Sequence, residues 1–186
     1  MTISRKARPS RRQRGMTLIE QIMVLAIVAT MTSMAIPAMG KLLGRNRLQV
    51  AQTDFIAALR HAREVAVFSG KRTLFCPTTD GNHCSDDGRW EHGWLLGHDA
   101  DRNDQPDNGP LYSGPRYDGK LVIVSNTGRH IVRFHPDGSA SGSNLTLLFC
   151  QPSSANHALA VVVSNTGRIR GAPASANQIA SCARMH

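Results

Sequence analysis

Hydrophobic residues form one long run near the start of the chain. Between Leu18 and Met39 the only ionisable side chain is that of Glu20. A helix needs about 20 apolar residues to cross a bilayer, so this pattern predicts a membrane-crossing helix. Basic residues precede the run, and the positive-inside bias then places that end of the chain in the cytoplasm and the rest across the membrane.

A second pattern follows from Lys41 to about Gly70, where apolar side chains recur every three or four residues. This spacing places them on one face of a helix, and most of the intervening arginines fall on the other side. Glycine often ends a helix, so Gly70 is a suitable stop. We therefore expect an amphipathic continuation of the same helix. Its buried face should consist of Leu48, Ala51, Phe55, Leu59, Ala62 and Ala66.

Beyond Gly70 the pattern changes to short apolar or alternating runs, separated by clusters of Gly, Asn, Asp and Pro. Such runs between turn residues are typical of β-strands. The runs are Thr73–Cys76, Gly93–Leu96, Leu121–Ser125, Ile131–His135, Leu145–Cys150 and Leu159–Ser164. We find no second segment with convincing helical periodicity. The pattern predicts an α+β fold in which antiparallel sheet packs against the long helix.

Composition and charge refine this picture. The chain has 186 residues, of which 41% are hydrophobic, enough for one compact domain with an appendage. Most of the net charge of +9 comes from the first 15 residues, which carry six basic side chains and no acidic one. Residues 76–118 are acidic overall, whereas residues 120–186 carry six basic side chains and one acidic. The C-terminal third is therefore the part that can attract a polyanion.

The lone carboxylate of Glu20 requires an explanation, because an acid in lipid costs about 3 kcal/mol. Cleavage after Gly15 would free an amine on Met16, one helical turn before Glu20. In a helical assembly, Glu20 of one subunit would then pair with the Met16 amine of its neighbour. A secretory signal cleaved after the apolar run, near Ser33–Ala35, is the alternative, and Glu20 argues against it.

Four cysteines follow the predicted membrane span, in a compartment where disulfides form. We favour a Cys76–Cys84 bond, which closes a short loop, and a Cys150–Cys182 bond, which ties down the end of the chain. Four cysteines nevertheless allow three pairings. A zinc site is the rival, helped by His83, but no Cys-x2-Cys pair is present.

An acidic segment resembles the opening of a calcium-binding loop, in which oxygen-bearing side chains alternate. Its alternating members are Asp99, Asp101, Asn103, Gln105 and Asp107. Asp104 then stands where the turn glycine belongs, and Pro110 replaces the closing glutamate. We therefore favour a solvated acidic hairpin loop over a calcium site.

No arrangement typical of catalysis is present. The eight histidines are scattered without ligand spacing, and no Ser/His/Asp set or phosphate-binding glycine loop can be found. Trp90 and Trp94 are expected to lie in the core or anchor a strand rather than to stack on bases. We expect neither an enzyme nor a bound cofactor or metal.

The sequence Gly-Arg-Ile-Arg-Gly at residues 167–171 is a candidate binding motif. On extended backbone, Arg168 and Arg170 project to the same face about 7 Å apart, a spacing similar to that of successive nucleic-acid phosphates. The flanking glycines would let the backbone approach a polyanion closely. Alternatively, two arginines on an edge strand only keep it soluble, and the motif taken alone favours this second interpretation.

The start of the chain resembles the type III signal of type IV pilins and pseudopilins. The resemblance rests on the basic leader, Gly15, the sequence M-T-L-I-E from Met16 to Glu20, and the apolar run with Pro37 near its end. It implies cleavage between Gly15 and Met16 by a prepilin peptidase, and N-methylation of Met16. It divides the chain into a leader (1–15), a transmembrane and filament-core helix (16–39), an amphipathic continuation (40–70) and a β-rich periplasmic head (71–186).

From Gly15 onward the chain resembles the GspH/FimT family. The resemblance also rests on the sequence from Arg133 to Gly138 and on the run V-V-V-S-N-T-G-R-I-R that ends at Arg170. GspH-like members are minor pseudopilins of type II secretion. FimT-like members are minor pilins of type IV pili, and in competence-linked members a C-terminal G-R-x-R motif contacts DNA. Gly167, Arg168 and Arg170 match that motif.

The resemblance therefore implies a pilin fold and a minor type IV pilin that binds double-stranded DNA without sequence specificity during natural transformation. Arg168 and Arg170 are the principal candidates. Arg129, in a matching S-N-T-G-R turn, and Arg184 are weaker ones. Other pilins, the prepilin peptidase and inner-membrane lipid are further expected partners. The expected location is the bacterial inner membrane, as a single-pass protein, and then a pilus or pseudopilus at the cell surface. The alternative is a structural minor pilin or GspH-like pseudopilin that acts in filament assembly without binding DNA.

Overall fold

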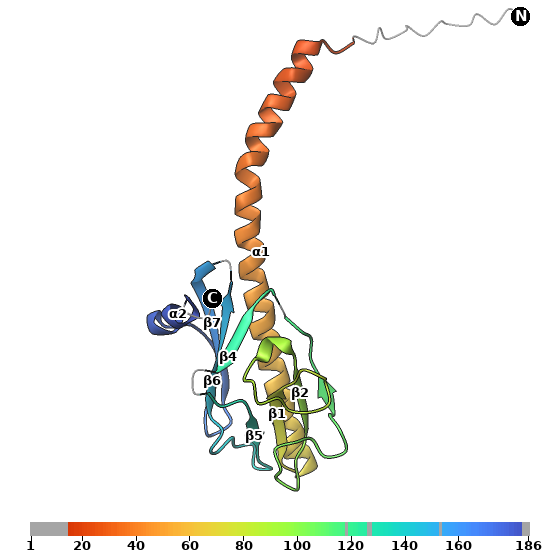
Figure 1. Ribbon diagram of the computed structural model, residues 1–186, viewed down its shortest axis with the longest axis vertical. Helices are drawn as coiled ribbons and strands as arrows, with labels where there is room; N and C mark the ends of the chain where they lie inside the picture. Colours follow the sequence, from red (N-terminus) through yellow and green to blue (C-terminus); the bar gives the residue numbers. More distant parts are fainter. Residues whose placement is uncertain (1–14, 118, 126–127, 153, 184–186) are drawn as a thin grey trace, which may run out of the picture. The chain divides into compact units, whose positions relative to one another are not determined.

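The computed structural model describes residues 15–117, 119–125, 128–152 and 154–183 (Figure 1). The chain divides into two compact units, one ending at Leu42 and one from Leu43 to His186. One long helix, α1 (Leu18–Ser69), contributes residues to both units. Strands β1 to β8 and the helix α2 belong to the second unit. The fold is α+β, as predicted.

In the first unit, helix α1 begins with a turn in which the Glu20 N–H bonds to the Thr17 carbonyl at 3.1 Å. Every described side chain of this unit is exposed, including large apolar ones such as Ile19, Met23 and Ile27. In the described part of the chain, no helix combines the length and the hydropathy that crossing a membrane requires.

In the second unit, α1 buries one face, and all six side chains predicted for that face are buried. The helix ends at Ser69, and Gly70 follows with a φ of +65°. Glycine adopts this left-handed conformation without a steric penalty. Every buried hydrophobic residue in the described chain lies in this second unit, which we call the head, so the head has a complete core of its own.

The head contains two four-stranded antiparallel sheets. The first has the strand order β3-β2-β1-β5. Its strands are β1 (Thr73–Pro77), β2 (Trp94–His98), β3 (Tyr112–Ser113) and β5 (Val132–Phe134). A short 3-10 helix, η1 (Trp90–His92), precedes β2.

The second sheet has the strand order β4-β6-β7-β8. Its strands are β4 (Val122–Ser125), β6 (Leu145–Gln151), β7 (Ser154–Val163) and β8 (Ile169–Pro173). All six runs predicted to form strands do so, although β7 begins earlier than expected. The two strands outside those runs are β3 and β8.

The prediction of no second helix is wrong, because α2 (Ala176–Ala183) follows β8. Ser175 and Gln178 form a reciprocal capping box: the Ser175 N–H donates to Gln178 Oε1 at 2.8 Å, and the Gln178 N–H donates to Ser175 Oγ at 3.4 Å. This S-x-x-Q spacing was readable in the sequence. A helix of two turns shows too little periodicity to be found by its apolar pattern, and here Ile179 and Cys182 pack on the second sheet.

Both favoured disulfides are present. Cys76 bonds to Cys84 and Cys150 bonds to Cys182, with Cα atoms 5.5 Å and 5.7 Å apart. The first closes the loop that follows β1. The second fastens α2 to β6, so the end of the chain is covalently held against the second sheet.

The aromatic ring of Phe55 lies at the centre of the core. It is fully buried, and its centroid lies 5.1 to 6.4 Å from those of five other rings. These rings belong to Phe75 of β1, Trp90 of η1, Trp94 of β2, Tyr117 and Phe149 of β6. Both tryptophans are therefore core residues, as predicted, and Phe55 connects α1 to both sheets.

Replacing Phe55 with Ala should lower the free energy of unfolding of the head by about 3–5 kcal/mol, because it leaves a cavity where both sheets meet the helix. Phe68 is the matched control, since it lies on the same helix with a side chain 88% exposed. Urea unfolding of the head from Leu43 onward measures both variants. Equal stability of Phe55→Ala and Phe68→Ala would contradict this description of the core.

Candidate nucleic-acid interface

Strand β8 forms one edge of the second sheet and pairs with β7 alone. The pairing places Arg170 opposite Val162 and Ile169 opposite Val163. It continues one residue before the strand, because the Ser164 N–H donates to the Arg168 carbonyl at 3.0 Å. Arg168 and Arg170 therefore both belong to the ladder.

The two arginines project from the outer face of this ladder. Ile169, between them, packs into the main core, and a Cβ on Gly171 would point at Gln52 and Ile56 of α1. Because side chains alternate along a strand, Arg168 and Arg170 lie on the side away from α1, and both are exposed. Among the described residues, neither has a carboxylate partner.

The turn before β8 holds Arg168 in place through several hydrogen bonds. The Gly167 N–H donates to the Ser164 carbonyl at 2.9 Å, and the Arg168 N–H donates to Ser164 Oγ at 3.2 Å. Ser164 Oγ also lies 2.9 Å from Thr166 Oγ1. The backbone that presents the first arginine is therefore well fixed.

This turn packs against a second glycine turn, which ends at Gly138. The Ala140 N–H donates to the Asn165 carbonyl at 2.9 Å. Gly167 has a φ of +75°, and a Cβ there would lie 1.9 Å from the Gly138 carbonyl oxygen. Packing inside the head thus supplies a reason for Gly167 that the sequence did not reveal, and the contact of Gly171 with α1 does the same for that residue.

Arg63 of α1 lies at the junction of the two turns. Its Nε donates to the Gly138 carbonyl at 2.8 Å and stands 3.1 Å from where a Cβ of Gly167 would be. The Arg63 side chain is exposed. Sequence reasoning missed this residue because no local pattern connects α1 with the Gly167 turn, and only the fold brings them together.

The weaker candidates lie elsewhere. Arg129 is exposed, and its Nη1 donates to the carbonyl and to Oδ1 of Asn144 at 2.8 Å and 2.9 Å. It follows β4, at the opposite edge of the sheet from β8. Arg184 lies outside the described residues. The structure therefore brings Gly167, Arg168 and Arg170 together and does not add Arg129 to them.

The acidic loop after β2 is crosslinked by two arginines. Arg72 binds Asp99 at 2.9 Å and Asp104 at 2.7 Å, and Arg133 binds Asp104 through Nε at 2.7 Å and through Nη2. The hydrogen bond from Arg133 holds the pKa of Asp104 below its usual value. Asp99 is fully buried, and burial raises its pKa although Arg72 opposes the change. The expectation of a solvated loop is therefore wrong for Asp99.

The other members of the proposed calcium pattern bond to neighbours in the protein. Asp101 accepts from Asn103 Nδ2 at 2.8 Å, and Asp107 accepts from the Ala100 N–H at 2.6 Å. Gln105 Oε1 accepts from the Cys84 N–H at 2.8 Å. Over the described ranges, no group of three or more His, Cys, Asp or Glu side chains could hold a metal ion.

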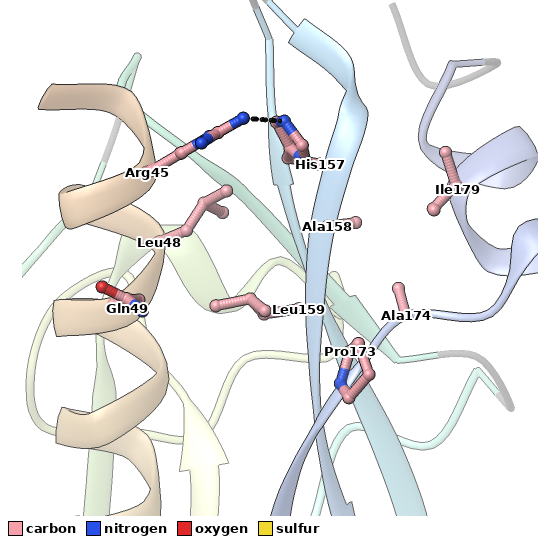
Figure 2. Close-up of a pocket in the computed structure, with 9 residues that line it drawn as sticks. All are labelled: Arg45, Leu48, Gln49, His157, Ala158, Leu159, Pro173, Ala174 and Ile179. Carbon is pink, nitrogen blue, oxygen red and sulfur yellow. Dashed lines mark hydrogen bonds between the residues drawn. The ribbon is translucent and has the colours of Figure 1, made fainter. Parts of the chain in front are cut away.

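A separate apolar groove of about 380 Å³ lies between α1, β7, β8 and α2 (Figure 2). Arg45 and His157 face each other at its rim, with Arg45 Nη2 2.8 Å from His157 Nε2. Because an arginine only donates, His157 Nε2 is the acceptor of this bond. The other lining residues are Leu48, Gln49, Ala158, Leu159, Pro173, Ala174 and Ile179.

Comparison with known protein families identifies the family to which the chain belongs. Residues 51–167 match the family of the type II transport protein GspH, and residues 10–36 match the prokaryotic N-terminal methylation motif. The first match covers more than half of the sequence. The chain belongs to the GspH family. This family consists of structural subunits of the pilin and pseudopilin type, so the GspH-family chain is a structural protein rather than an enzyme.

Solved structures show that this GspH-family chain has a pilin fold. The type IV minor pilin FimU of Pseudomonas aeruginosa matches with a TM-score of 0.59 and 22% identity, over 69% of this chain and 90% of FimU. A second crystal form of FimU gives a TM-score of 0.56 and 21% identity, over 68% and 93%. The minor pseudopilin EpsH of the Vibrio cholerae type 2 secretion system gives 0.49 and 13%, over 68% and 96%. Curated protein sequences gave no match.

Replacing Gly167 with Ala should destabilise the head more than replacing Gly128, the equivalent glycine of the other S-N-T-G-R turn. Both have positive φ, +75° and +69°, which costs a residue with a Cβ about 1–2 kcal/mol. Only Gly167 would also clash, since a Cβ on Gly128 meets no atom within 4 Å. Overpacking should add about 1–3 kcal/mol. Urea unfolding measures the difference, and equal losses would contradict the packing of the two turns.

Proposed function

We propose that this GspH-family chain is a minor pilin that binds double-stranded DNA without sequence specificity and serves DNA uptake in natural transformation. The observation that carries the proposal is the pair Arg168 and Arg170. Both side chains are exposed on one face of an edge strand, and no described carboxylate neutralises them.

The spacing of the pair suits a phosphate backbone. Residues two apart on a strand are separated by about 7 Å, and the phosphates along one nucleic-acid strand repeat at a similar distance. Contacts to phosphate fix position but carry no sequence information. Binding by one head should therefore be weak and strongly dependent on salt, and several copies in one filament would strengthen it through avidity.

Gly167, Arg129 and Arg184 are secondary members of the proposed site. Gly167 contributes by shaping the turn that presents Arg168. Arg129 already binds Asn144 through Nη1, so it contributes less than the pair on β8. Arg184 follows α2 closely in the sequence, and α2 is tied to the head by the Cys150–Cys182 bond.

The protein would reach a filament after processing at its N-terminus. The prepilin peptidase would cut between Gly15 and Met16, and Met16 would be methylated, as the match to the N-terminal methylation motif supports. Residues 16–39 would anchor the protein in inner-membrane lipid as a single-pass helix and then form the filament core. Glu20 would pair with the Met16 amine of a neighbouring pilin. Residues 40–70 would continue the helix to the β-rich periplasmic part of the chain, residues 71–186.

A purely structural role is the second candidate. The match to GspH favours a pseudopilin of type II secretion, and the exposed apolar side chains of the first unit favour contacts with other pilins. A deletion strain separates the two roles. Lost DNA uptake with normal piliation supports the DNA-binding pilin, whereas normal uptake with lost piliation or secretion supports the structural role.

The double substitution Arg168→Gln with Arg170→Gln should weaken binding of the head to duplex DNA about tenfold or more at low salt, because two charge-assisted phosphate contacts are lost. Fluorescence anisotropy with a labelled duplex measures this. Arg47→Gln with Lys120→Gln is the control. It removes the same charge from two exposed positions that line a different groove, between α1 and the segment that precedes β4. If the double variant binds as tightly as the parent protein, the DNA-binding assignment is wrong.

The mature protein should begin at Met16 and carry one added methyl group. Intact-mass and N-terminal peptide spectrometry on protein from its native membrane or filament measures this. A mature chain that begins at any other residue would contradict the proposed processing and, with it, the role of Glu20 in assembly.

A further inference from the structure

We propose that Arg60 and Arg63 of α1 form a second row of phosphate contacts, so that DNA lies along the β8 edge between two rows of arginines. The inference rests on the proposed function and extends its site by two residues from a distant part of the sequence. It follows from how α1 and β8 lie beside each other in the head.

Helix α1 and strand β8 run side by side in opposite directions. Gln52 Nε2 donates to the Ala172 carbonyl at 3.3 Å, and Ile56 Cδ1 would lie 3.1 Å from a Cβ on Gly171. Eleven residues after Gln52, Arg63 reaches the Gly167 turn. The helix from residue 52 to residue 63 therefore lies antiparallel to the chain from residue 167 to residue 172.

Arg60 occupies the position between these contacts. Residues three and four apart share a helix face, so Arg60 lies on the face of Ile56 and Arg63, beside the middle of β8. Its side chain is exposed. Arg60 and Arg63 therefore flank β8 on the α1 side, whereas Arg168 and Arg170 project from the opposite face of the sheet.

The backbone between the two rows is open to a ligand. Ser164 pairs with Arg168 and Ala158 pairs with Ala174 through hydrogen bonds, and such pairs alternate along an antiparallel ladder. The N–H and carbonyl of Gly171 therefore point away from β7, toward the edge. Gly171 is exposed, so a phosphate can reach this edge with arginines on both sides.

The positive charge of the two rows exceeds the acidic charge close to them in the sequence. Within the part of the chain that the structure describes, none of Arg60, Arg63, Arg168 and Arg170 has a carboxylate partner. Glu64 follows Arg60 by four residues on the exposed part of the helix, and Asp137, next to Gly138, accepts from the Ser139 N–H at 2.9 Å. Four cations therefore face two carboxylates.

Arg63 is also oriented in advance. Its Nε is bonded to the Gly138 carbonyl, which restricts the guanidinium while its terminal nitrogens remain available for a phosphate. A restricted side chain loses less conformational entropy on binding than a free one. Arg60, with no such bond among the described residues, provides charge without a fixed orientation.

The test compares the salt dependence of duplex binding for three double variants of the head: Arg60→Gln with Arg63→Gln, Arg168→Gln with Arg170→Gln, and the control Arg47→Gln with Lys120→Gln. The slope of log K against log salt changes by about 0.9 for each phosphate contact. The α1 variant should reduce the slope by about 2, as should the β8 variant, since each loses two contacts. The control variant should change the slope by less than half as much as either of these two variants.

The outcomes separate this inference from the function on which it rests. If the β8 variant loses binding and the α1 variant keeps the parent slope, the second row is wrong and the proposed DNA contact stands. If the β8 variant keeps the parent slope, the proposed function itself fails. Thermal unfolding checks that each variant is folded. Should loss of the Gly138 bond unfold the Arg63 variant, Arg60→Gln alone decides: a slope reduced by about 1 supports the second row, and an unchanged slope overturns it.

Discussion

The contact of the Phe55 ring with both sheets is the interaction on which the arrangement of the head depends. Helix α1 carries no other aromatic side chain in the core, and this ring meets partners from β1, β2 and β6. It thereby fixes the rotation of α1 about its axis. That rotation directs Gln52 and Ile56 toward β8 and places Arg63 over the Gly138 turn, so the composition of the candidate interface is a consequence of core packing.

The edge strand β8 illustrates how structural and binding requirements coincide. An unpaired strand edge invites association with other chains, and charged side chains are a common protection against it. Gln52 and Ile56 cover the inner face of β8, and the exposed arginines discourage pairing with another strand. The same charges attract a polyanion, which presents phosphates rather than backbone hydrogen-bonding groups. The protection of this edge is therefore compatible with the proposed contact to nucleic acid.

The distribution of ion pairs in the head decides which basic side chains remain available to a polyanionic ligand. Counted along the sequence, the C-terminal third has six basic side chains. Arg133 is bound to Asp104, and Arg129 is partly engaged by Asn144. In the acidic segment, the carboxylate of Asp99 is likewise paired with Arg72. Part of the charge that looks segregated along the chain is thus paired inside the head, whereas the exposed arginines of β8 and of the adjacent part of α1 have no carboxylate partner among the described residues.

The sequence by itself determined the class of the protein and much of its architecture. Helical periodicity identified the buried face of α1, alternation located six strands, and the favoured cysteine pairings are both present. These features depend on local spacing, which a sequence displays directly. Only the tertiary structure decided that Gly167 packs on Gly138, that Asp99 is buried beside Arg72, and that Arg63 joins the Gly167 turn. Each of these contacts joins segments far apart in the chain, and their geometry follows from the packing of α1 against two sheets, which no local pattern encodes.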